Sequence, residues 1–414
     1  MFSEDRGVAR GDISLAGMRI AVLEPAGHGG LLHYSAQLAD ALAARGHAVD
    51  LIVPRGNELS GRVTRAAMRE VLPLLVSSPA PAETRSAYFR RRTGTAVRLV
   101  RAWTRMLWET RPGHYDAVLH GADIGVLPAA LASLVMSAVP KRPVLVRIAH
   151  NVRAFNRWGG EELFDPSPFN RALLGRVYRG FDLVLVHGER SRTEFEETWG
   201  PARIAIVPHG DERIFADEPP PPSPQERILF FGDWRKVKGL PILMDAFDEL
   251  VRRRPTARLT VAGTPSPEDW DPEVVRRWAR GHDGRVDVVD HYVPIGEVAE
   301  IFAQARVVAT PYVAGYQSGV IHLAATMARP VVTSDVGDLP NAVQDGVTGL
   351  VVPAGDAERL AAALEEILAD PELAARMGEA ARSTVLTGSS WEGVAARVEA
   401  ELYALARDDA RNSP

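Results

Sequence analysis

The chain has 414 residues, 46% of them hydrophobic and 24% charged, with a net charge of −5 and no cysteine. This length suits two domains of about 200 residues each, and the composition excludes a disordered chain. The lack of cysteine excludes disulfides and thiolate metal sites, residues 1–17 are too polar for a secretory signal, and no apolar run approaches the ~20 residues of a membrane span.

The first half alternates strands and helices. A strand at 18–23 is followed by a loop at 24–30, a helix at 31–45 and a strand at 48–53, which together predict a βαβ unit. Later runs rich in Val, Ile or Leu are typical of parallel strands covered on both faces. These runs span residues 117–119, 144–148, 183–186 and 204–207.

A proline-rich stretch at 216–226 divides the chain, since its five prolines cannot continue a strand or helix. The second half repeats the alternation. Its strands are predicted at 228–231, 259–262, 286–289, 307–310, 331–334 and 350–352, and its helices at 240–254, 272–280, 295–305 and 318–328. A helical tail follows at 356–406, with breaks near 370–371 and 387–390.

These elements predict an α/β fold with two Rossmann-like domains, each built on a doubly wound parallel sheet. We expect an N-terminal domain at 1–215, a linker at 216–226 and a second domain at 227–390. The C-terminal helix, at 391–414, is expected to pack back toward the first domain.

Ligands of doubly wound sheets bind beyond the carboxyl ends of the strands. The loop after the strand at 228–231 begins with Gly232 and carries Arg235, Lys236 and Lys238 just before a helix. Glycine admits a ligand to the backbone, and the cations with the helix N-terminus favour a diphosphate. A solvated charge run is the simpler alternative. The chain has only three lysines, two of them in this loop, which favours phosphate binding.

Two further loops end strands on the same expected side. Gln317-Ser318-Gly319 opens a predicted helix, where Ser318 suits the N-cap and the first amides suit a phosphate. The loop His28-Gly29-Gly30 follows the first strand, as in many βα turns, and is expected to contact the acceptor or a phosphate.

A histidine follows the strand at 144–148. A lone histidine is more often structural than functional, but the place of His150 at a strand end favours a functional role.

A metal site is not expected. Asp269 and Asp271 form an Asp-x-Asp triplet, but Asp271 lies before Pro272 and suits a helix N-cap. No spacing indicates a zinc site. We therefore expect neither a metal nor another cofactor.

The second half resembles glycosyltransferase family 4, and the resemblance implies the GT-B fold, in which two facing Rossmann-like domains have a cleft between them. The matching stretches lie at 228–239, 286–305 and 317–356, while the match in the first half is limited to Gly29-Gly30, His150 and residues 207–210. The resemblance implies a nucleotide-diphosphate sugar donor on the second domain, a hydroxyl acceptor on the first, and transfer with retention of configuration and without a metal.

The resemblance also implies roles for single residues. Lys238 matches a lysine that contacts the donor diphosphate, next to Gly232. The arginine usual after that glycine is replaced by Asp233, and Arg235 is expected to substitute. Tyr292 and Val293 match the segment that lines the nucleobase. His150 matches a histidine that touches the transferred sugar.

Two glutamates of the family pattern are missing. Counting back from Pro330 places them at Gly315 and Leu323. We expect Gln317, Ser318 and Gly319 to orient the donor instead, with Gln317 and His150 as the catalytic residues. A retaining transfer in which the leaving phosphate takes the acceptor proton needs no carboxylate base.

The sequence thus predicts a metal-independent hexosyltransferase of the cytoplasm, acting in polysaccharide or glycoconjugate biosynthesis. The missing glutamates leave a non-catalytic, sugar-nucleotide-binding paralogue as an alternative. Another GT-B enzyme, such as a sugar-nucleotide epimerase, is a second one.

The segment Arg85–Arg111 holds eight arginines and one acid, Glu109. Six of its apolar residues share one helical face, with Arg98, Arg101 and Arg105 opposite. They are Ala96, Leu99, Val100, Trp103, Met106 and Leu107. The simpler interpretation is a helix packed on its sheet with solvated arginines. The alternative is peripheral docking on anionic lipid at the inner face of the membrane, toward a lipid-linked acceptor. The charge balance is too mild for a nucleic-acid partner.

Overall fold

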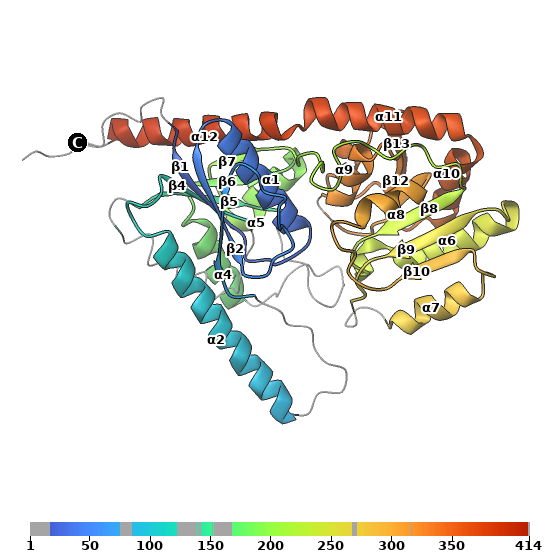
Figure 1. Cartoon of the computed structure of the whole chain (residues 1–414), viewed down its shortest axis with the longest axis horizontal. Coiled ribbons are helices and arrows are strands. Elements are labelled where there is room, and N and C mark those ends of the chain that lie inside the picture. The colour runs from blue at the N-terminus through green and yellow to red at the C-terminus, as the bar shows by residue number, and fades with distance from the viewer. Residues whose placement is uncertain are drawn as a thin grey trace, which may run out of the picture.

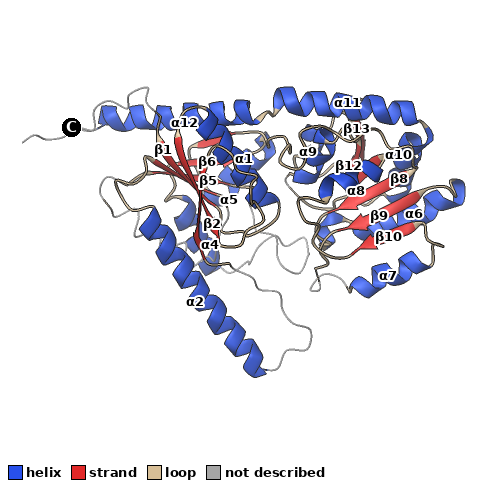
Figure 2. Cartoon of the chain, viewed as in Figure 1, coloured by secondary structure: helices blue, strands red, loops and turns tan. Residues whose placement is uncertain are grey.

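Two parallel sheets, joined through the proline-rich stretch, organise the chain in a computed structural model (Figures 1 and 2). The structure describes residues 17–74, 85–121, 139, 142–150, 152, 168–266, 271–315 and 317–412. The prediction of two α/β domains is confirmed.

The first sheet has seven strands in the order β3-β2-β1-β4-β5-β6-β7, all paired in parallel. Its elements are β1 (Arg19–Leu23), α1 (Gly30–Ala44), β2 (Ala48–Pro54), β3 (Ala67–Leu72), α2 (Arg85–Glu109), β4 (Ala117–His120), β5 (Val144–Ile148), α4 (Pro168–Tyr178), β6 (Leu183–Val186), α5 (Glu189–Trp199) and β7 (Ile204–Ile206). The edge strand β3 was not predicted, because Arg69 and Glu70 interrupt its apolar pattern.

The second sheet has six strands in the order β10-β9-β8-β11-β12-β13, again all parallel. Its elements are β8 (Arg227–Phe231), η1 (Lys236–Lys238), α6 (Leu240–Arg253), β9 (Arg258–Ala262), α7 (Pro272–Arg280), β10 (Val286–Val289), α8 (Val298–Gln304), β11 (Val307–Thr310), α9 (Gly319–Thr326), β12 (Val331–Ser334), η2 (Leu339–Ala342) and β13 (Gly349–Val352). The helices α10 (Ala357–Ala369), α11 (Pro371–Gly388) and α12 (Trp391–Asn412) follow.

The strand order reverses between β1 and β4 in the first sheet and between β8 and β11 in the second. Loops after such switch points form the binding crevice of doubly wound sheets. The loops after β1, β8 and β11 therefore hold the candidate site.

The C-terminal helices tie the halves together. In Figure 1, α11 runs over the second sheet and α12 over the first. The α12 side chains Trp391, Val394 and Val398 are buried in one core with Leu38 and Leu42 of α1. A fully buried apolar side chain contributes about 1.5–3 kcal/mol, so the end of the chain stabilises the first domain.

The helix α2 extends away from the body of the first domain in Figure 1. It contacts its sheet through Met106, which is buried together with Ala102. The predicted apolar face is wrong at Val100, which is 60% exposed. Side chains before Val97, apart from Gly94, lie outside the described residues.

Candidate active site

The loop at 232–239 follows β8 and is held by two close approaches that need glycine. Gly239 has a φ of 67°, and a Cβ there would lie 1.8 Å from the carbonyl oxygen of Pro311. Gly263 has a φ of 141°, and its Cβ would lie 1.9 Å from the carbonyl oxygen of Gly232. The loop is therefore packed against the segments that follow β9 and β11, its neighbours in the sheet.

Lys238, Tyr312 and Ser318 form one polar cluster at this edge. The ammonium nitrogen of Lys238 lies 3.9 Å from the ring centroid of Tyr312, which is a cation–π contact. The hydroxyls of Tyr312 and Ser318 are 2.9 Å apart. The structure thus brings together Lys238 and Ser318, which were predicted from separate motifs. Tyr312 was missed, and its place just after β11 was the signal that could have found it.

Ser318 directly precedes α9, as predicted, but its side chain caps no amide of that helix. The predicted capping bond is wrong, because the hydroxyl pairs with Tyr312 instead. A helix start without a side-chain cap keeps its partial positive charge available to an anion. Gly319 is the first residue of α9, so this charge lies beside the cluster of Lys238.

On the first domain, the loop at 28–30 meets the second domain through one carboxylate, Glu58. The amide of Gly29 donates to Glu58 Oε1 over 2.7 Å, and the Tyr292 hydroxyl donates to it over 2.5 Å. His33 Nε2 lies 2.8 Å from the same oxygen. His28 packs edge-on against Tyr292, with ring centroids 4.9 Å apart. His28, Gly29 and Tyr292 are therefore assembled around a residue that the sequence analysis missed.

The charge of Glu58 follows from these contacts. Burial acts to raise its pKa, but the hydrogen bonds from His33, Tyr292 and Gly29 outweigh burial and lower the pKa. Burial and then Glu58 raise the pKa of the Tyr292 phenol, which stays protonated. The first helix therefore has an ionised carboxylate at its N-terminus. The neighbouring Val293 is 4% exposed and packs in the core of the second domain.

His150 lies in a cluster of imidazoles that runs from β5 to α9. The ring centroids of His150 and His187 are 5.0 Å apart. Those of His187 and His209 are 5.8 Å apart, and those of His209 and His322 are 4.7 Å apart. Tyr34 of α1 packs edge-on against His150 at 4.6 Å. Burial, and then the neighbouring histidines, lower the pKa of His150 and His209 well below the ordinary value. His187 and His209 also follow strand ends, the signal that singled out His150.

Gln317 faces this cluster rather than Lys238. It lines a cavity of about 150 Å³ together with His187, His209 and Asp338. Among the described residues, its Oε1 and the Nε2 of His150 are buried polar atoms with no hydrogen-bond partner. Such atoms are unfavourable until a partner binds, so both are ready to accept a donor from a ligand.

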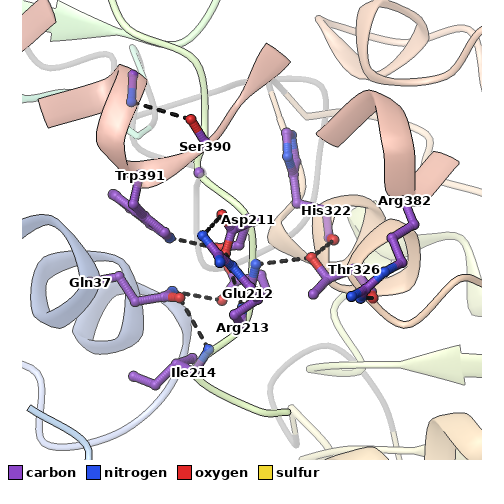
Figure 3. Close-up of polar contacts among 12 residues, drawn as sticks. Gln37, Asp211, Glu212, Arg213, Ile214, His322, Thr326, Arg382, Ser390 and Trp391 are labelled. Atoms are coloured by element: carbon purple, nitrogen blue, oxygen red, sulfur yellow. Dashed lines mark hydrogen bonds and ion pairs between the residues drawn. The ribbon is translucent and has the colours of Figure 1, made fainter. Parts of the chain in front are cut away.

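The positions of the missing glutamates hold no acid. Leu323 is 3% exposed and belongs to the core of the second domain. The carboxyl of Glu212, in the segment between β7 and β8, approaches α9 instead. A Cβ added to Gly319 would lie 3.6 Å from Oε1 of Glu212. Glu212 accepts a hydrogen bond from Gln37 of α1, and its amide donates to Thr326 of α9 (Figure 3). Burial raises the pKa of Glu212 to about 8.

Beside Glu212, two hydrogen bonds join Asp211, which precedes the proline-rich stretch, to the start of the last helix, where the chain returns to the first domain. The amide of Asp211 donates to the carbonyl oxygen of Ser389 over 3.0 Å. Trp391 Nε1 donates to the carbonyl oxygen of Asp211 over 2.7 Å, as Figure 3 shows. On the other side of the interface, Asp338 accepts from the amide of Ser191 at the start of α5.

The described residues contain no group of histidines and acids arranged for a metal ion. Asp271 caps α7, as predicted, by accepting from the amide of Glu273 over 2.9 Å. Asp269 lies outside the described residues.

Two family models match the chain. One is described as "Glycosyl transferases group 1" and matches residues 225–370, and the other as "Glycosyltransferase Family 4" and matches residues 28–210. A glycogen synthase of Mycobacterium tuberculosis is 28% identical over 92% of this chain and 92% of its own length. A GDP-mannose-dependent phosphatidylinositol monomannoside mannosyltransferase of Mycolicibacterium smegmatis is 32% identical over 58% of this chain and 67% of its own length.

Solved structures share the fold. The Anabaena protein HepE in complex with UDP-glucose has a TM-score of 0.71 at 18% identity, over 94% of this chain and 100% of that one. The sucrose-phosphate synthase of Thermosynechococcus elongatus has a TM-score of 0.69 at 20% identity, over 94% and 99%.

Proposed function

The chain belongs to the group 1, family 4 glycosyltransferases, and we propose that it transfers a hexose from a nucleotide-diphosphate sugar to a hydroxyl acceptor, with retention and without a metal. The cluster of Lys238, Tyr312 and Ser318 at the start of α9 is the observation that carries this proposal. It places a cation, two hydroxyls and a helix N-terminus around one point, which suits a diphosphate.

In this proposal the nucleotide diphosphate lies along the loop at 232–239. Lys238 and Arg235 neutralise the charge that grows on the leaving phosphate as the bond from the sugar C1 breaks. A positive cluster of this kind supplies the charge stabilisation that a metal gives in other transferases. In this proposal Tyr292 and its neighbour Val293, whose side chain packs in the core of the second domain, lie on the nucleobase side.

The sugar would be oriented by the two buried acceptors that lack partners, His150 Nε2 and Gln317 Oε1. The acceptor oxygen attacks C1 on the face that the phosphate leaves, and its proton passes to the departing phosphate oxygen. That transfer requires no ionised carboxylate, which agrees with the absence of acids at Gly315 and Leu323.

The test has two stages. A thermal-shift screen against UDP-glucose, GDP-mannose and ADP-glucose, each with and without EDTA, is expected to select one nucleotide and to show no effect of EDTA. With the selected donor, slow release of free sugar in the α configuration is expected when no acceptor is added. Binding without any release of sugar would favour the non-catalytic paralogue, and an epimerised nucleotide sugar would favour the epimerase.

We also propose that the acceptor is linked to a lipid and that α2 docks on the cytoplasmic face of a membrane. No described helix is long and apolar enough to cross a membrane. Val97, Val100 and Trp108 are exposed on α2, at 45%, 60% and 60%, and their spacing places them on one stripe. Arg111, just past the end of α2, stacks on the Trp108 ring, with the carbon of its guanidinium 4.5 Å from the ring centroid. The phosphatidylinositol mannoside named for one relative is an acceptor of this class.

Liposome flotation tests this docking. Recovery is expected with vesicles that contain anionic phosphatidylglycerol, and loss of recovery with neutral vesicles or with Trp108→Ser. A Val274→Ser variant, which removes an apolar side chain 42% exposed on the second domain, is the matched control. Equal recovery from both kinds of vesicle, or none from either, contradicts electrostatic docking.

A further inference from the structure

A chain of two hydrogen bonds joins the backbone of β7's end to His150. His187 Nδ1 lies 2.9 Å from the carbonyl oxygen of Val207. His187 Nε2 lies 3.1 Å from Nδ1 of His150. Nε2 of His150 is buried and, among the described residues, has no partner.

The protons on this chain follow by elimination. A carbonyl oxygen only accepts, so His187 carries a proton on Nδ1. Burial lowers the pKa of His187 to about 4, and that of His150 well below its ordinary value, so both rings are neutral at neutral pH. The Nε2 of His187 is then bare and accepts from His150 Nδ1. This leaves the lone pair of His150 on its unpartnered Nε2.

Packing fixes both rings in this arrangement. Tyr34 meets His150 edge-on, with centroids 4.6 Å apart, and meets His187 at 5.4 Å. Trp391 in turn packs edge-on against the Tyr34 ring, with ring centroids 5.0 Å apart. Rings held in this way cannot turn to exchange donor for acceptor without disturbing the core of the first domain.

We propose that His187 is a positioning residue, which holds His150 in the tautomer with its proton on Nδ1 so that Nε2 accepts a hydrogen bond from a hydroxyl of the transferred sugar. The sugar half of this inference rests on the proposed function. It also defines a substrate class. A sugar with a free hydroxyl at this point donates a hydrogen bond to Nε2 of His150. A sugar with a carboxylate there would bring two hydrogen-bond acceptors together with no proton between them.

Nitrogen-15 NMR on histidine-labelled protein tests the tautomer directly, because protonated and bare imidazole nitrogens resonate far apart. His47 supplies an internal reference for the opposite tautomer, with the proton on Nε2. The amide of Met18 donates to its Nδ1, so its proton is on Nε2, toward Glu399. The signals of His150 are assigned by their loss in His150→Phe. A proton on Nε2 of His150 in the wild type would overturn the proposal.

The sugar contact has its own readout. Addition of UDP-glucose or GDP-mannose is expected to shift the Nε2 signal of His150, and the matching free nucleotide, UDP or GDP, is not. This difference reports the hydroxyl contact even if no transfer is detected, so failure of the proposed catalysis is distinguishable. A saturating nucleotide sugar that leaves the signal in place would refute the sugar half of the proposal.

Two substitutions separate positioning from folding. In His187→Gln the amide can donate to Val207 and accept from His150, so the tautomer and most of the turnover should survive. His187→Leu can do neither and is expected to lower kcat about ten-fold, with UDP or GDP binding unchanged. His282→Leu is the control, since His282 also bonds a backbone carbonyl, that of Trp278, outside the site. Turnover in His187→Leu within about two-fold of wild type would overturn the positioning role.

Discussion

Replacing Glu212 by glutamine should stabilise the protein at neutral pH. The carboxyl is 3% exposed, and burial, with a smaller effect of Asp211, raises its pKa from 4.5 to about 8. Below about pH 4.5 the group is protonated in both the folded and the unfolded chain and contributes nothing. As the pH rises from there toward 8, the unfolded chain loses the proton and the folded chain keeps it, so the fold is progressively destabilised.

The magnitude follows from the size of this gap. In the unfolded chain the carboxyl has its ordinary pKa of 4.5, which lies about 2.5 units below pH 7. Each unit corresponds to about 1.4 kcal/mol, so keeping the proton in the folded state lowers the unfolding free energy at pH 7 by about 3 kcal/mol. Glutamine carries no such penalty and can still accept from Gln37, which lies 3.1 Å from Glu212 Oε2. The facing ionisable groups are His209, whose Nε2 is 3.9 Å from Glu212, and Asp211, which pairs with Arg213.

Urea unfolding of the wild type and Glu212→Gln at about pH 5, 6, 7 and 8 measures the effect. The difference between the two proteins should be small near pH 5 and grow to about 3 kcal/mol near pH 7. Burial also raises the pKa of Glu24 to about 7, but this second group affects both proteins equally and cancels. A difference that stays constant with pH would refute a protonated Glu212.

Substitutions of Lys238 and Gln317 test the site, with Lys236 as the comparison for Lys238, and a substitution of Gly188 tests the domain interface. Lys238→Ala should weaken binding of the free nucleotide diphosphate by about 1.5–3 kcal/mol in calorimetry, and Lys236→Ala less; equal effects would remove Lys238 from a special role. Gln317→Ala should lower kcat more than it weakens binding of the nucleotide, and unchanged turnover would contradict a role toward the sugar. Gly188→Ala would place a Cβ 2.6 Å from Cγ of Asp338, so a loss of about 1 kcal/mol in unfolding free energy is expected, and wild-type stability would argue that the interface adapts.

The fold could be predicted from local patterns because buried parallel strands are short apolar runs with loops at their carboxyl ends. The loop at 232–239 was found in the same way, since its glycines and cations are adjacent in sequence. Glu58 and Glu212 could not be predicted from such local patterns. Each acquires its environment from contacts that bridge the two domains, with Tyr292 and with Thr326. A single carboxylate in a loop carries no sign of them.

The helix positions show a different limit. The spacing correctly placed Ser318 just before α9. It did not predict the partner of the Ser318 hydroxyl, which bonds Tyr312 instead of a helix amide. The periodicity of α2 correctly placed Met106 against the sheet, but it also suggested a buried Val100, which is exposed, and it missed the buried Ala102. Periodicity defines a stripe on a helix, but the edge of the sheet decides how wide a stripe is covered.

The charges around the crevice bear on the proposal that transfer needs neither of the two family glutamates. Close to α9 the carboxyl of Glu212 is protonated, and His150 and His209 are neutral. Lys238 and the start of α9 carry the positive charge at this edge, and Asp338 lines the cavity next to Gln317 and Ser318. The ionised Glu58 lies on the first domain, bound to Gly29 and Tyr292. The proposed function therefore has the diphosphate on the second domain and its sugar directed toward His150 and Gln317.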